Sequence, residues 1–347
     1  MNFGSLKGLN KLHLGGNQLR LGKAHDLNFL DSLINCSSLL VLDIRNNRLS
    51  GVLPDSMANL STQLTWLNIK SNRIFGNIPS GIQNLVGLTA LIMGQNFPTG
   101  NIPIGVGKLN EVEELFLGTN ELWGQFPSSL GNISRLYELI LDGNNLIGSI
   151  PSSLRNFTYM KFIDLQNNNL SGSLPKQLFS FTSLIELHVG NNFFTGNLPV
   201  ETGNLQSLQT LNVANNKLSG EIPNLLGNFL SLEYLWLEGN FFRGSVPSAF
   251  STLRGLQSLD LSCKIMSGKI PQYLENLSAL QYLNLSFNDF EGELPKQRVF
   301  GNASQISVLE NSKLCGGIQE LQLPACSRQV SKKGGNISCF KSENLDN

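Results

Sequence analysis

The sequence predicts an α/β solenoid, a superhelical horseshoe with short parallel β-strands on its concave face and 3-10 turns, short helices and irregular turns on its convex side. Three observations predict this fold. One apolar skeleton recurs about every 24 residues, and its leucines alternate with other residues as in a half-buried strand. Glycine and asparagine are abundant, at 34 and 41 of the 347 residues, which argues against a helical chain.

The recurrence is clearest in the middle of the chain. The segment LNVANNKLSGEIP that begins at Leu211 returns 24 residues later as LWLEGNFFRGSVP. Extended along the chain, the skeleton reads L-x-x-L-x-L-x-x-N-x-L-x-G-x-I-P, the pattern of a leucine-rich repeat. Twelve consecutive units fit between about residues 6 and 300, with one insertion around LGKAHDLNF and with Lys264 where the series requires asparagine.

Elementary chemistry explains what each unit keeps. The L-x-L alternation has period two, so both leucines of a short strand point into the core while the flanking residues face solvent. The asparagine follows the strand, where its amide can satisfy backbone groups of adjacent turns and build a ladder. The expected ladder consists of Asn47, Asn72, Asn96, Asn120, Asn144, Asn168, Asn192, Asn216, Asn240 and Asn288, with Asn17 as an earlier member.

Several function classes lack support. The net charge is zero and 14% of residues are charged, so nothing favours nucleic acid or an anionic membrane as a partner. No apolar run approaches the roughly 18 residues of a membrane span. His13, His25 and His188 lie in separate contexts without a nucleophile motif, and no kinase signature is present. We therefore predict a non-enzymatic protein without a cofactor, and no cysteine pair has zinc-like spacing.

The elements LSGSLPKQL, LSGEIPNLLGN and MSGKIPQYLENL resemble the plant-specific class of leucine-rich repeats, marked by L-x-G-x-I-P. The segments HDLNFLDSLINCSSLLVLDIRNNRLSGVLP and NSKLCGGIQELQLPAC look like the ectodomains of plant leucine-rich-repeat receptor kinases. They are most similar to the immune group that includes the flagellin, elongation-factor and rice bacterial-blight receptors. The resemblance covers about residues 5–326.

The resemblance implies an extracellular or cell-surface module in three parts. Repeats are expected over 1–300, a C-terminal cap over 301–326 and a polar, disordered tail over 327–347. Receptors of this kind also carry a signal peptide, a cysteine-paired N-terminal cap, a membrane span and a kinase, and none of these is found in the sequence. The chain is therefore interpreted as a truncated relative of such a receptor.

The five cysteines do not pair completely. Cys315 and Cys326 bracket the end of the repeats, where a solenoid must shield its last apolar surface, so we expect a disulfide there, with two free thiols as the alternative. Cys36 is expected to be a buried thiol, and no pairing is assigned to Cys263 or Cys339. The sequons expected to be glycosylation candidates are Asn35, Asn59, Asn132, Asn156, Asn169, Asn276 and Asn302, besides Asn336 and the concave-face Asn284.

Variation between the units points to a binding surface. The residues beside the strand leucines form columns across the concave face, roughly 4.8 Å apart. One stretch combines apolar side chains with an acidic edge, which suits an extended peptide with hydrophobic and basic side chains, and another holds exposed aromatics. The candidate ligand contacts are Ile92, Phe116, Ile140, Phe162, Glu114, Glu138, Asp142, Glu186, His188, Tyr234, Trp236 and Glu238.

The predicted function is ligand recognition: a peptide or protein ligand, pathogen-derived or endogenous, bound on the concave or lateral face in immune or developmental signalling. The resemblance also implies a leucine-rich-repeat co-receptor kinase that docks near the C-terminal repeats. Two alternatives stay open. One is a secreted inhibitor of microbial cell-wall-degrading enzymes such as polygalacturonase, and the other is a truncated decoy or non-functional fragment.

Overall fold

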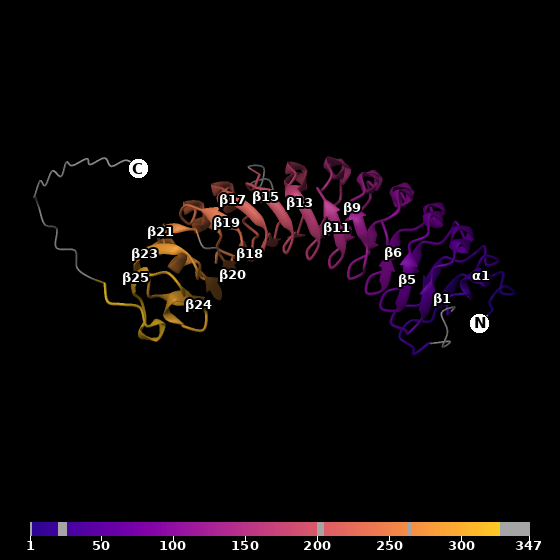
Figure 1. Cartoon of the computed structure of the whole chain (residues 1–347), viewed down its shortest axis with the longest axis horizontal. Helices are drawn as coiled ribbons and strands as arrows, with labels where there is room; N and C mark the ends of the chain where they lie inside the picture. Colours follow the sequence, from indigo (N-terminus) through magenta and orange to yellow (C-terminus); the bar gives the residue numbers. More distant parts are fainter. Residues whose placement is uncertain (1, 20–25, 200–204, 263–264, 327–347) are drawn as a thin grey trace, which may run out of the picture.

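The computed structural model describes residues 2–19, 26–199, 205–262 and 265–326 as one curved solenoid. Figure 1 shows the arc, with the N-terminal units at one end, the last units at the other and the short helical turns along the outer rim. Several sequence expectations fall outside the described residues. They concern Cys263, Lys264, part of the LGKAHDLNF insertion, and the tail 327–347 with Asn336 and Cys339.

The concave face is one parallel sheet of thirteen described strands, joined in chain order. Each strand is three residues long except the last, and its middle residue is a buried leucine or isoleucine in the first twelve. The strands are β1 (Lys11–His13), β2 (Val41–Asp43), β4 (Trp66–Asn68), β6 (Ala90–Ile92), β8 (Glu114–Phe116), β10 (Glu138–Ile140), β12 (Phe162–Asp164), β14 (Glu186–His188), β16 (Thr210–Asn212), β18 (Tyr234–Trp236), β20 (Ser258–Asp260), β22 (Tyr282–Asn284) and β24 (Ile306–Ser307). The predicted solenoid with a concave parallel sheet is confirmed.

The L-x-G segments form a second set of parallel strands, which the sequence did not lead us to expect. In β11, for example, Leu146 is buried while Asn145 and Ile147 face solvent. These strands are β3 (Ser50–Val52), β5 (Arg73–Asn77), β7 (Phe97–Thr99), β9 (Trp123–Gln125), β11 (Asn145–Gly148), β13 (Asn169–Ser173), β15 (Phe193–Gly196), β17 (Lys217–Glu221), β19 (Phe241–Arg243), β21 (Ser267–Lys269), β23 (Asp289–Leu294) and β25 (Lys313–Gly316). They form three separate sheets on the lateral face: β3, β5 and β7; the six strands β9 to β19; and β21, β23 and β25. The six-stranded one, which holds β9 and β11, is called the lateral sheet below.

Proline marks where most 3-10 turns begin. Pro127, for example, is extended at φ −72° and ψ 122°, and the next residue starts the turn. Besides the short helix α1 (Leu30–Leu33), the described turns are Asp55–Asn59, Ser80–Asn84, Ile104–Lys108, Ser128–Asn132, Ser152–Asn156, Lys176–Ser180, Asn224–Asn228, Ser248–Thr252, Gln272–Asn276, Arg298–Gly301 and Gln319–Leu321.

The asparagines form a ladder from Asn47 to Asn240, and it resumes at Asn288 beyond the unit that holds Lys264. Asn168 is representative: its amide nitrogen donates to the carbonyl oxygens of Leu141, Leu165 and Gln166, and its oxygen accepts the backbone N–H of Leu146 at 3.0 Å. Each side chain thus ties its own turn to the preceding unit and satisfies buried backbone groups of both. The ladder continues to Asn311, which lies one unit beyond the expected end and accepts from the Phe290 N–H.

Two cysteine expectations can be compared with the structure. Cys315 and Cys326 form a disulfide with an S–S distance of 2.08 Å, and Cys315 lies in β25, the last strand of the three-stranded sheet β21–β23–β25. Cys36 is a buried free thiol, and burial raises its pKa. The disulfide therefore closes the last described turn of the chain, while Cys36 packs in the first units.

Candidate ligand-binding surface

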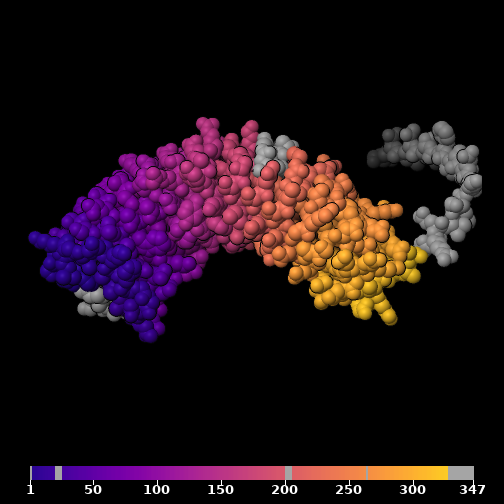
Figure 2. Space-filling view, turned by 180° about the vertical axis from the view of Figure 1, so that it is seen from behind, coloured from indigo at the N-terminus to yellow at the C-terminus, as the bar shows by residue number. Residues whose placement is uncertain are grey.

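The strand register sets the columns of the concave face. Consecutive strands pair residues 24 positions apart, so that Phe116 lies opposite Ile92 on one side and Ile140 on the other. The same register continues through Asp164 and His188. The side chains that flank the strand leucines therefore face one surface in two rows, which Figure 2 shows as the hollowed underside of the arc.

The central patch comprises Ile92, Phe116, Ile140 and Phe162 with Glu114, Glu138 and Asp142. Phe116, Ile140 and Phe162 are half-buried and accessible from the concave side. The expectation that Ile92 is exposed was wrong, because its side chain is only 5% exposed. Strands about 4.8 Å apart allow large neighbours to close over a residue between them, and Ile92 lies between Asn68 and Phe116.

The acidic edge of the central patch brings several carboxylates close together. Glu114 and Glu138 are direct partners on adjacent strands, and burial, together with Glu114 and Glu186, raises the pKa of Glu138. The Tyr137 hydroxyl donates to Glu114 at 2.6 Å. Burial also raises the pKa of Asp142, and it raises that of Asp164, one strand further on, to about 6. A cationic side chain placed here would relieve carboxylates that repel one another.

The aromatic patch comprises Glu186, His188, Tyr234, Trp236 and Glu238, as the sequence grouped them. The ring centroids of His188 and Trp236 are 6.5 Å apart, and those of Tyr234 and Trp236 are 5.9 Å apart. His188 Nε2 lies 3.1 Å from Glu186 Oε2. The rings are half-buried. They offer a semi-rigid apolar platform of the kind that concentrates binding energy.

Glu238 lies at the edge of the aromatic patch, and its carboxyl group is partly buried. Burial, reinforced by the neighbouring Asp260, raises its pKa to about 7. Its Oε2 atom is buried and has no hydrogen-bond partner among the described residues. Asp260 is already engaged by the Ser262 backbone N–H at 3.0 Å and by Asn284 at 2.9 Å. Glu238 Oε2 therefore lacks a donor in the free chain, and a bound molecule would reach it only after a change of the side-chain rotamer.

The sequons divide by exposure. All seven candidates are exposed: Asn35, Asn59, Asn132, Asn156, Asn169, Asn276 and Asn302. Asn284 differs, because it is half-buried on the concave face, where its amide nitrogen donates to Asp260 and Ser262. A glycan at Asn284 would break these bonds, whereas the seven exposed positions would carry one without disturbing the concave sheet.

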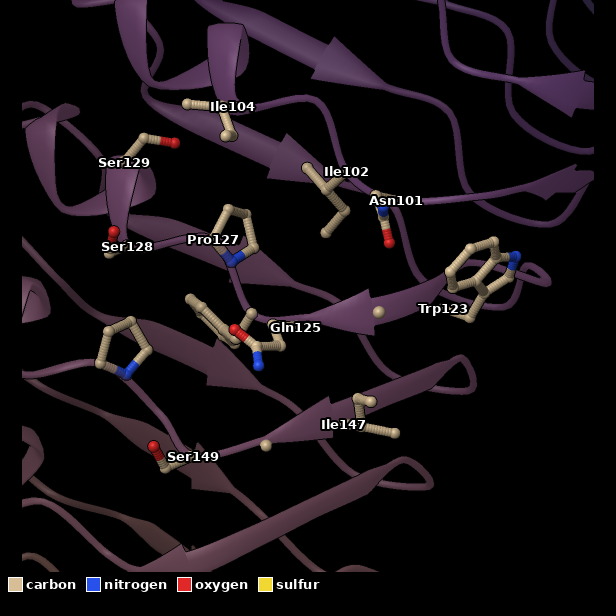
Figure 3. Close-up of a pocket in the computed structure, with 14 residues that line it drawn as sticks. Asn101, Ile102, Ile104, Trp123, Gln125, Pro127, Ser128, Ser129, Ile147 and Ser149 are labelled. Atoms are coloured by element: carbon tan, nitrogen blue, oxygen red, sulfur yellow. The ribbon is translucent and has the colours of Figure 1, made fainter.

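The lateral sheet holds a surface that sequence reasoning missed. A groove of about 830 Å³ lies between β9, β11 and the adjoining 3-10 turns, and Trp123, Ile104 and Ile147 line it (Figure 3). The exposed fractions of these side chains are 54%, 77% and 48%. The signal in the sequence was a bulky apolar residue before the repeat glycine in two consecutive units, LWG and LIG, where four of the other units have a serine.

Both surfaces are extended and open, which defines a class of protein: a repeat solenoid that recognises other molecules along its faces. No helix in the described ranges is long and apolar enough to cross a membrane. The family model for a leucine-rich repeat region matches residues 152–334, more than half of the chain, and the single-repeat model matches 38–60, 63–85 and 135–157. The chain belongs to the leucine-rich-repeat family.

Its relatives are plant receptor kinases. Receptor kinase-like protein Xa21 of Oryza sativa subsp. japonica is 43% identical over 91 residues, or 26% of this chain and 9% of Xa21. The Arabidopsis receptor kinase HAESA, solved with the peptide hormone IDA and the co-receptor SERK1, superposes with a TM-score of 0.80 at 32% identity. That match covers 90% of this chain and 51% of HAESA.

A second solved structure agrees. The plant peptide hormone receptor RGFR1 in complex with RGF2 gives a TM-score of 0.70 at 30% identity, over 91% of this chain and 57% of that receptor. The chain thus has the fold of a plant receptor-kinase ectodomain and spans about half of such solved chains. The predicted resemblance to this group of receptors is confirmed.

Proposed function

We propose that this chain is a non-catalytic, extracellular recognition module that binds a peptide or protein ligand along its concave face. The observation that carries the proposal is the pairing of accessible apolar and aromatic groups with two carboxylates, Glu138 and Glu238, for which no ion pair with a described residue is found. Phe116, Ile140 and Trp236 present apolar surface, and Glu138 and Glu238 have raised pKa values beside them. An extended peptide with apolar and basic side chains complements this surface.

The related structures support this choice of ligand. HAESA and RGFR1 are both solved with peptide hormones bound, and HAESA also with a co-receptor. By analogy, this chain would act at the cell surface, and a co-receptor kinase of the same repeat class would dock near its C-terminal units. The signalling output, immune or developmental, would then come from a kinase reached through that assembly.

The proposal is tested by selecting linear 12-residue peptides from a random displayed library on the purified chain. Selected peptides should be enriched in lysine or arginine next to aromatic or aliphatic residues. Phe116→Ala and Trp236→Ala should each weaken binding by about tenfold or more, because truncating a central aromatic anchor costs about 2 kcal/mol or more and 1.4 kcal/mol is tenfold.

The matched control is Phe241→Ala on the lateral sheet, where the side chain is 52% exposed and lies away from the concave strands. All three variants should keep the wild-type circular dichroism. Peptides whose affinity is unchanged by both concave variants, or lowered equally by the lateral control, would refute the concave assignment.

A further inference from the structure

The lateral groove has a chemistry different from that of the concave face. Besides its apolar wall, it is lined by neutral hydrogen-bonding side chains, among them Asn101, Gln125 and Ser129, and none of its described lining residues is charged. Figure 3 shows Gln125 on the same strand as Trp123, with Ser128 and Ser129 on the adjoining turn. A charged ligand would therefore find no counter-charge in this groove.

The floor of the groove is backbone rather than side chain. Gly124 and Gly148 line it with φ values of +88° and +80°, a conformation that favours glycine. A Cβ atom at Gly124 would collide with the side-chain amide of Asn101. The two glycines keep the hollow open between Trp123 and Ile147 and let a ligand approach the main chain closely.

One polar group in the groove has no partner. The Ser129 hydroxyl oxygen is buried and makes no hydrogen bond with any described residue. A buried unsatisfied hydroxyl is unfavourable, and most such groups are satisfied in native proteins. An apolar protein segment laid into the groove would leave this oxygen unsatisfied. A ligand with many hydroxyl groups would satisfy it once the Ser129 side chain, which lines the groove, rotates toward the ligand.

We propose that the lateral groove binds a neutral oligosaccharide, with one sugar ring against the Trp123 face and hydroxyl groups bonded to Asn101, Gln125 and Ser129. Sugars combine apolar C–H faces with dense, uncharged hydroxyl groups, which matches a wall of aromatic and aliphatic groups interleaved with amides and hydroxyls. The volume of about 830 Å³ lies in the range of small-ligand pockets.

The chain could also supply a sugar of its own. Asn169, a sequon asparagine, is the register partner of Ile147 on the next strand, so a glycan there would lie at the rim of the groove. The proposal concerns a free oligosaccharide. The test therefore uses Asn169→Gln protein, in which that source is absent.

The chain has three tryptophans, so Trp66→Phe and Trp236→Phe leave Trp123 as the only one. In this background, cellohexaose, laminarihexaose and maltohexaose are titrated while Trp123 emission is followed. At least one should shift the emission to shorter wavelength and saturate, with little change between 0.05 and 0.5 M salt. A hexagalacturonate of equal length should bind more weakly, because the groove offers no cation.

The affinity of two variants for the sugar that binds is then measured by calorimetry. Trp123→Ala should lower affinity by about tenfold or more. Ser129→Ala should also weaken binding, yet it should not lower the melting temperature of the free protein, because the hydroxyl has no partner to lose. If none of the three neutral sugars gives a saturating change of Trp123 emission, the proposal is overturned. Tighter binding of hexagalacturonate than of the neutral sugars would also overturn it.

A further outcome would assign the groove to the chain's own glycan and overturn the proposal. In glycosylated protein with Asn169 intact, Trp123 emission would already be at short wavelength, and Asn169→Gln would shift it back without restoring a response to any added sugar. Self-association that Trp123→Ala abolishes and no sugar affects would instead assign the groove to a protein contact, which would equally refute the inference.

Discussion

Asn168→Ala is the sharpest test of the asparagine ladder. Asn168 lies in the middle of the array and is 6% exposed. Its amide nitrogen donates to the carbonyl oxygens of Leu141 and Leu165, but the amides of Asn144 and Asn192 also donate to these two oxygens. The substitution therefore leaves both carbonyls with a partner.

The larger cost comes from losing the amide oxygen of Asn168, which is a hydrogen-bond acceptor. The buried Leu146 N–H donates to Asn168 Oδ1 at 3.0 Å and would lose that acceptor. An unsatisfied buried donor costs about 1–3 kcal/mol, and the weakened carbonyl bonds add about 1 kcal/mol. We therefore expect a local destabilisation of about 2–4 kcal/mol.

The assay is hydrogen–deuterium exchange resolved by peptide, because repeat arrays open locally and a single unfolding free energy need not describe them. Exchange at Leu146 and its neighbours should accelerate about 30- to 700-fold, since 1.4 kcal/mol is tenfold. Asn169→Ala, at the exposed next residue, is the matched control in unglycosylated protein. Equal exchange in the two variants would refute the ladder as a source of stability.

Two further predictions concern titration and the disulfide. The folded pKa of Glu238, about 7, exceeds the ordinary value of 4.5, so the folded chain holds more protons and its stability falls as pH rises from about 5 to 8. In the Glu238→Gln variant, the melting temperature should depend less on pH over this interval. A pH dependence equal to that of the wild type would contradict the raised pKa of Glu238. The Cys315–Cys326 disulfide closes an 11-residue separation, so its removal by serine substitution should cost about 3 kcal/mol. Faster hydrogen exchange should be confined to β23 and β25; a uniform effect along the array would argue against this view.

The repeat skeleton could be predicted because it obeys a fixed interval. Leu139 and Leu115 are 24 residues apart in the sequence and are direct partners on the concave sheet. The columns of that face therefore follow from counting. Asn311 was missed although I-x-V-x-x-N ends the described ladder, because the unit after Asn288 is one residue shorter and lacks the repeated leucines.

The lateral groove could not be predicted in the same way. On that sheet Ile147 pairs with Gln125, an offset of 22 residues, so the neighbours are staggered with respect to the repeat. Which exposed residues meet there depends on the tilt of each unit against the next. Exposure on the concave face has a similar origin, because the burial of Ile92 depends on how the side chains of adjacent strands close over it.

A ligand bound along the concave strands should protect their backbone amides from solvent. We would therefore measure hydrogen–deuterium exchange of the chain with and without a saturating selected peptide. We predict slower exchange in β8, β10 and β18, which hold Phe116, Ile140 and Trp236, and no change in the lateral strands β9 and β11. Protection restricted to the lateral sheet or the convex 3-10 turns, with unaltered exchange in the concave strands, would contradict this prediction.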